Sequence, residues 1–94
     1  MKTFDDLIKD RELISRMLRK ATRGEINDFD FIVDYVSTGR PIVRFMFAVP
    51  GKIKKQYGGD MIELLDNHDE TIKSVISAAG YPEIFSRSVV SSVL

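Results

Sequence analysis

The densest group of side chains able to bind a charged partner lies in the sequence GKIKKQY, which starts at residue 51. Its three lysines could contact phosphates or an acidic protein surface, and its tyrosine could stack on a base. Arg40 lies upstream, and no acidic residue separates it from the last of these lysines. The predicted partner-binding residues are Arg40, Lys52, Lys54, Lys55 and Tyr57.

Charge is segregated along the chain, although its 14 basic and 14 acidic residues balance. The basic run at 40–55 lies between acidic runs at 25–34 and 60–70. These runs are either solvated faces that pair with one another inside the fold, or they leave a basic patch open to an acidic protein or a phosphate backbone. Three lysines make few phosphate contacts. We therefore expect a protein partner, with a nucleic-acid-binding regulator that uses residues 40–57 as the alternative.

The residue types that support metal or catalytic chemistry are scarce. The only histidine, His68, is followed by two acids and preceded closely by Asp66, but neighbours in a helix do not share a face, so we predict no metal site. The chain has no cysteine and no glycine-rich phosphate loop. Paired carboxylates form only in space, so the sequence does not test for them. On this basis we expect no cofactor and no enzyme activity.

Arg44 is the single charge in the longest apolar run, residues 41–50. A buried, unpaired guanidinium is very costly, so Arg44 must reach solvent or pair with Asp30 or Asp34. A second hypothesis makes it an anchor in a groove or interface, where arginine is favoured. We expect Arg44→Ala to lower the stability by a few kcal/mol, as stranding a buried partner would.

The capping and periodicity signals predict an all-α fold: one domain, residues 1–94, with five to seven short helices around the apolar run 41–50. A helix is expected at 4–23, with acids in its first turn, bases in its last and Gly24 as the C-cap. Four pairs of residues have the spacing of an N-terminal cap and its acid. These pairs are Thr3 with Asp6, Asn27 with Asp30, Asp60 with Glu63, and Asn67 with Glu70.

The segment from 28 to 49 fits two conformations. As a helix, Phe29, Ile32, Val33 and Val36 form one stripe; as a strand, alternate residues share a face, and the aromatic and β-branched content favours this. The Gly39–Pro41 spacing is typical of one helix ending and another starting, which favours helices at 28–38 and 42–49. The alternative is an α+β fold with a β-hairpin at 29–49.

Further helices are expected at 51–57, 61–66 and 68–79, with a last one starting at Pro82. In the last helix, Val89, Val93 and Leu94 either dock on the core or belong to an amphipathic end that pairs with a second copy. The C-terminal helix is therefore the expected route to a homo-oligomer.

Composition favours a regulatory role over chemistry. Absence of cysteine fits a cytoplasmic protein, and the longest apolar run is well short of the roughly 20 residues of a membrane helix. The charged N-terminal sequence MKTFDDLIKD does not resemble a secretory signal. We therefore expect a small regulator or inhibitor that acts by protein–protein interaction, a type common among phage and mobile-element products.

Overall fold

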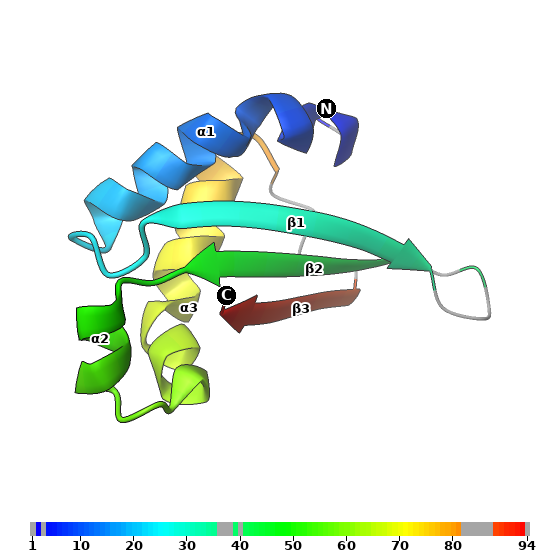
Figure 1. The fold of residues 1–94 in the computed structure, drawn as a ribbon. Helices are drawn as coiled ribbons and strands as arrows, with labels where there is room; N and C mark the ends of the chain where they lie inside the picture. The colour runs from blue at the N-terminus through cyan, green and yellow to red at the C-terminus, as the bar shows by residue number, and fades with distance from the viewer. Residues whose placement is uncertain (1, 3, 36–38, 40, 82–87, 94) are drawn as a thin grey trace.

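The computed structural model describes residues 2, 4–35, 39, 41–81 and 88–93, and they form an α+β fold (Figure 1). In chain order the elements are α1 (Phe4–Ala21), β1 (Asp28–Tyr35), β2 (Pro41–Ala48), α2 (Gly51–Gln56), α3 (Met61–Ala78) and β3 (Ser88–Val93). The described strands make one sheet in the order β1-β2-β3. β1 is antiparallel to β2, and β3 is parallel to it.

The prediction of an all-α fold, with helices at 28–38 and 42–49, is wrong. β1 and β2 pair antiparallel with Phe29 opposite Phe47 and Tyr35 opposite Pro41, as in the alternative hairpin at 29–49. Gly39, with φ of 78°, lies between the two strands and does not cap a helix. Pro41 is the first residue of a strand, a position that tolerates its missing N–H. The conformation adopted therefore follows the alternation of large apolar residues along the chain, and not the helical spacing of Phe29, Ile32, Val33 and Val36.

The two faces of the sheet differ sharply. In Figure 1, α3 lies behind the strands and α1 runs above β1; α1 packs on β1 and α3, and α3 also contacts β3. Most of the described side chains on the face toward these helices are buried and Phe31 is half-buried, whereas Asp28, Ile32 and Arg44, on the other face, are exposed. The buried members on the two strands are Phe29, Val43, Phe45 and Phe47. This period of two is what one covered face of a sheet requires.

The apolar run 41–50 lies at the centre of the molecule, as predicted, but in strand conformation. β2 is the middle strand, and Phe45 and Phe47 have no exposed surface. The rings of Phe29 and Phe45 meet edge to face, with centroids 5.3 Å apart, and Phe47 lies 5.9 Å from Phe29. Such aromatic pairs stabilise a core beyond the area that they bury.

The first helix agrees with its prediction and ends within two residues of it. Leu7, Ile14 and Leu18 form its buried stripe. The hydroxyl of Thr22 donates to the Leu18 carbonyl at 2.7 Å and accepts the Ile26 N–H at 3.0 Å, which closes the helix end. Gly24 adopts φ of 82°, and its N–H donates to Arg19 O, as in a glycine C-cap.

The helices predicted at 61–66 and 68–79 are a single helix, α3. The cap pair at its start is confirmed, because Asp60 Oδ1 accepts the Glu63 N–H at 3.0 Å. Asn67, expected to cap a second helix, lies in its interior. No glycine or proline interrupts residues 61–78, and Leu64, Ile72 and Val75 continue one buried stripe along the whole length.

The C-terminal helix predicted from Pro82 is wrong for residues 88–93, which form β3. Valine and serine are weak helix formers, and β-branched valine suits a strand. A homo-oligomer through a C-terminal helix therefore has no helix to use at 88–93. Residues 82–87 and Leu94, like Thr3 of the first predicted cap, lie outside the described part of the chain.

A polar contact joins the two ends of the helical layer. Asp10 Oδ2 accepts from Lys2 Nζ at 2.8 Å and from the Tyr81 hydroxyl at 2.6 Å. Lys2 also donates to the Ala79 carbonyl, at the end of α3. These bonds favour the ionised carboxylate, and they lower the pKa of Asp10, chiefly through Lys2 and then Tyr81.

We predict that replacing Asp10 with Asn makes the loss of stability on acidification smaller. A carboxyl with a lowered folded pKa stabilises the fold above its unfolded pKa of about 3.9, and this contribution disappears as the pH falls through the folded value. Chemical denaturation at several pH values should show a smaller loss on acidification for Asp10→Asn than for the wild type. Asp5→Asn, at an exposed acid of the same helix, is the control. An equal loss of stability on acidification in all three proteins would contradict the prediction.

Truncation of two neighbouring residues of β2, Phe45 and Arg44, should change the free energy of unfolding by very different amounts. Phe45→Ala opens the core and should lower the free energy of unfolding by about 3–5 kcal/mol. Arg44 is exposed, so Arg44→Ala should change stability by about 0.5 kcal/mol or less, rather than by the few kcal/mol expected from the sequence. Urea titrations followed by circular dichroism measure both. A loss of several kcal/mol for Arg44→Ala would contradict this prediction and support the expectation from the sequence that Arg44 pairs with a buried partner.

Candidate functional site

Four of the five predicted partner-binding residues, Lys52, Lys54, Lys55 and Tyr57, lie on or directly after α2, a six-residue helix that follows β2. The Pro50 carbonyl accepts the Ile53 N–H at 2.9 Å, which starts the helix, and the glycine pair 58–59 with positive φ follows it. None of the residues of α2 is buried. Lys52 and Lys55 are exposed, and Lys54 is half-buried. The helix therefore offers its lysines to solvent without contributing to the core.

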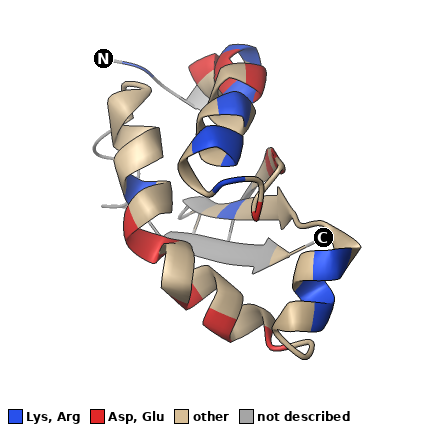
Figure 2. Cartoon of the chain, turned by 90° about the vertical axis from the view of Figure 1, so that its left-hand side faces the viewer, with Lys and Arg blue, Asp and Glu red and all other residues tan. Residues whose placement is uncertain are grey.

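Opposite charges occupy different helices in the fold. Figure 2 shows α2 with basic residues alone and the first half of α3 with acidic ones. Among the described residues, no ion pair or hydrogen bond involves the side chain of Lys52 or Lys55, whereas Lys54 has an interaction partner. Within the described part of the chain, these two lysines are thus solvated and do not pair with the acidic runs. Arg40, the remaining predicted residue, lies outside the described residues.

Tyr57 belongs to a polar cluster that the sequence did not reveal. Its hydroxyl donates to Glu25 Oε1 and accepts from the Asn67 amide, each at 3.3 Å. His68 Nε2 lies 3.3 Å from the same Glu25 oxygen, and 14% of the His68 side chain is exposed. Glu25 precedes β1, so this cluster holds the end of α2 and the middle of α3 against the loop after α1.

His68 contacts an acid that is far from it in the sequence. It occupies the inward stripe of α3, four residues after Leu64 and four before Ile72. Its partner is Glu25, 43 residues away, rather than an adjacent acid. Within the described residues, no group of three or more His, Cys, Asp or Glu side chains could hold a metal ion. The cluster joins these elements to one another and does not involve Lys52 or Lys55.

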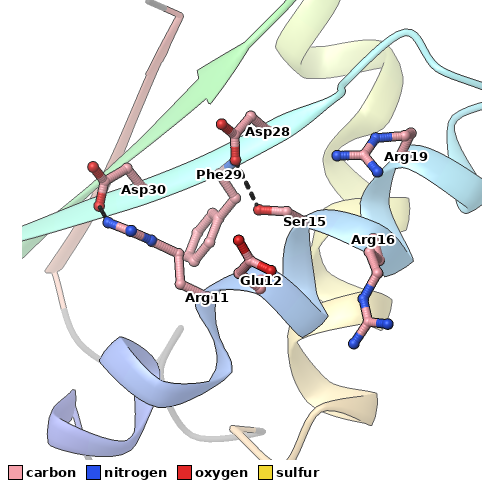
Figure 3. A pocket seen from close by; sticks show the side chains of 8 residues that line it. All are labelled: Arg11, Glu12, Ser15, Arg16, Arg19, Asp28, Phe29 and Asp30. Carbon is pink, nitrogen blue, oxygen red and sulfur yellow. Dashed lines mark hydrogen bonds and ion pairs between the residues drawn. The ribbon is translucent and has the colours of Figure 1, made fainter.

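A polar hollow of about 420 Å³ lies between α1 and β1 (Figure 3). Its walls combine three arginines with three acids, so their charges cancel. Arg11 pairs with Asp30 at 3.4 Å, and Arg19 donates to the Asn27 carbonyl at 2.9 Å. The lining residues are Arg11, Glu12, Ser15, Arg16, Arg19, Asp28, Phe29 and Asp30. Much of this polar surface is already used to join α1 to β1.

The outer edge of β1 beside this hollow is closed to strand pairing at its start. The Phe29 N–H donates to Ser15 Oγ at 3.1 Å, so it faces α1 and not β2. The Ser15 hydroxyl donates in turn to Asp28 Oδ1 at 3.0 Å, and the Phe31 N–H donates to Asp30 Oδ1 at 2.8 Å. Side chains thus occupy the N–H groups that an added strand would need.

Comparisons with known proteins place no further constraint on this site. No protein-family model matches the chain, and neither a curated protein nor a solved structure matches it. Among the described residues, none of the helices is both long and apolar enough to cross a membrane. The geometry of the surface is therefore the basis for the functional proposal.

The cluster around Tyr57 should contribute modestly to stability. Its contacts of 3.3 Å are long for hydrogen bonds from a hydroxyl, so we expect Tyr57→Phe to cost about 1 kcal/mol or less. The specific check is a double-mutant cycle with Glu25→Ala, measured by urea unfolding. Contacting residues should show a coupling energy of about 0.5 kcal/mol or more. Strictly additive losses would mean that the Tyr57–Glu25 contact contributes nothing.

Proposed function

We propose that this chain is a small regulatory or inhibitory protein that binds another protein through α2 and the residues beside it. The supporting observation is the state of Lys52 and Lys55. Both are exposed, and neither has a partner among the described side chains, in a chain whose charges balance overall. Unneutralised charges of one sign on one helix favour an oppositely charged partner.

The partner surface should be acidic. Charge complementarity of this kind accelerates association and excludes basic surfaces more than it adds raw affinity. Tyr57 lies at the end of the same helix, and its hydroxyl is held by Glu25, so a partner would meet a positioned ring beside the lysines. Since α2 contributes no buried residue, its lysines can change without opening the core. The absence of cysteine supports a cytoplasmic location as part of this proposal.

Nucleic-acid binding remains the competing proposal for the same lysines. The exposed lysines of α2, Lys52 and Lys55, can neutralise few phosphates, so the electrostatic part of nucleic-acid binding would be small. This favours a protein partner over a nucleic acid.

Charge reversal on α2 tests the proposal. Proteins crosslinked to the wild-type chain in lysate from its own organism are compared with those crosslinked to Lys52→Glu/Lys55→Glu. Lys9→Glu/Lys20→Glu on α1 is the matched control, because it changes two other exposed lysines and the net charge equally. A partner identified in this way is then purified and titrated. We expect the α2 variant to lose at least tenfold in affinity while the control and the melting temperature of the variant hardly change.

Undiminished binding by the α2 variant would overturn the proposed surface. Binding to a single-stranded DNA column tests the nucleic-acid alternative. This alternative is favoured if the wild type is retained at about 50 mM salt, is released by about 200 mM, and the α2 variant is not retained.

A further inference from the structure

Helix α2 differs from α1 and α3 in how it is attached to the fold. It has six residues and none of them is buried, whereas α1 and α3 have 18 residues each and a buried stripe. α1 packs extensively on β1 and α3, but among the described elements α2 has no comparable contact with a helix or a strand. Isolated helices shorter than about 12 residues are marginal in water, because nucleation is costly. The stability of α2 therefore depends on a few side-chain contacts.

The start of α2 lacks the features that stabilise the first turn of a helix. Its N-cap residue is Pro50, which makes no side-chain hydrogen bond to that turn, and the turn has no acidic residue. The glycine pair 58–59 follows the helix with φ of 61° and 83°, and glycine loses more conformational freedom on folding than any other residue. Opening of α2 would therefore give up little stabilisation at its start and would release these two glycines.

Glu25 joins α2 to the rest of the fold through a polar contact. Its Oε1 accepts the Tyr57 hydroxyl at the end of α2 and lies 3.3 Å from His68 Nε2 in α3. Both contacts use the same oxygen and are longer than the usual distance of about 2.8 Å for a hydroxyl donor. Lys54 also has an interaction partner, and Ile53 is half-buried. None of these five residues belongs to the buried hydrophobic core, so their contacts can break while the core stays packed.

We infer that α2 opens locally, without unfolding of the sheet and the two long helices, and that Glu25 is a positioning residue that limits this opening. Segments with few buried apolar contacts open with free energies well below that of global unfolding. A partner that recognises the helical arrangement of the α2 lysines binds only the closed form, so opening competes with binding. This link to binding rests on the function proposed for α2, whereas the opening itself does not.

Amide hydrogen exchange of the full chain, followed by NMR at several low concentrations of urea, tests the inference. The probes are the amides of Tyr57 and Gly59, which donate to the carbonyls of Ile53 and Lys54, and the amides of the middle strand β2. After correction for intrinsic rates, we expect the two α2 probes to exchange at least about 100-fold faster than the slowest β2 amides. Their rates should hardly change with urea, because local opening exposes little surface, whereas the rates in β2 should rise steeply.

Two conservative variants distinguish α2 from the core. Tyr57→Phe removes one hydroxyl contact and should accelerate exchange at α2 about twofold to fivefold. Ile14→Val shortens a fully buried side chain of α1 and should accelerate exchange in β2 about twofold to tenfold. It should leave α2 unchanged, because local opening keeps the contacts of Ile14. Glu25→Ala should accelerate exchange at α2 at least as much as Tyr57→Phe, and Glu25→Gln, which keeps an acceptor oxygen, should stay closer to the wild type.

Equal protection and equal urea dependence of α2 and β2 in the wild type would overturn the inference, because α2 would then open only with global unfolding. Acceleration of exchange at α2 by Ile14→Val would do the same. An unchanged exchange rate at α2 in Glu25→Ala would overturn the role of Glu25. The proposed function is tested separately by Lys52→Glu/Lys55→Glu: normal partner binding by that variant would overturn the function, while the exchange measurements would still decide whether α2 opens.

Discussion

The packing of phenylalanine side chains from β1 and β2 beneath α1 and α3 is the constraint on which the remaining structure depends. Phe29, Phe45 and Phe47 contact one another through edge-to-face and tilted ring pairs and are almost fully buried. Because side chains alternate along a strand, a register shift of one residue would move such a ring to the open face and Arg44 into the core. Burial of these rings therefore determines the register, and the register determines which residues remain available for binding.

A sheet covered on one side separates stability from recognition. The core needs only the helix-facing side chains, so the open face and α2 can carry charge and exposed apolar groups at little cost to folding. These two surfaces lie on different elements, one on the strands and one on the helix after β2. Variants of each surface can therefore be examined in a folded protein.

Polar contacts between distant segments orient the helices around this core. Tyr81 reaches Asp10 across 71 residues, His68 reaches Glu25 across 43, and Ser15 receives the Phe29 N–H from the strand edge. Such bonds contribute less to stability than the burial of one large apolar side chain, which contributes roughly 1.5–3 kcal/mol. The aromatic core therefore supplies most of the stability. The polar contacts select how α2 and α3 lie against the rest.

The sequence alone determined the features that depend on neighbouring residues: the first helix, the short helix after Pro50, the Asp60 cap and the central position of residues 41–50. It could not decide between helix and strand at 29–49, because the apolar residues there fit both periods and the choice depends on strand pairing. The sequence also grouped five candidate binding residues. It did not show which of them have partners within the fold. The tertiary structure decided that Tyr57 and His68 share Glu25 while Lys52 and Lys55 stay exposed, because contacts between segments far apart in the chain leave no local pattern.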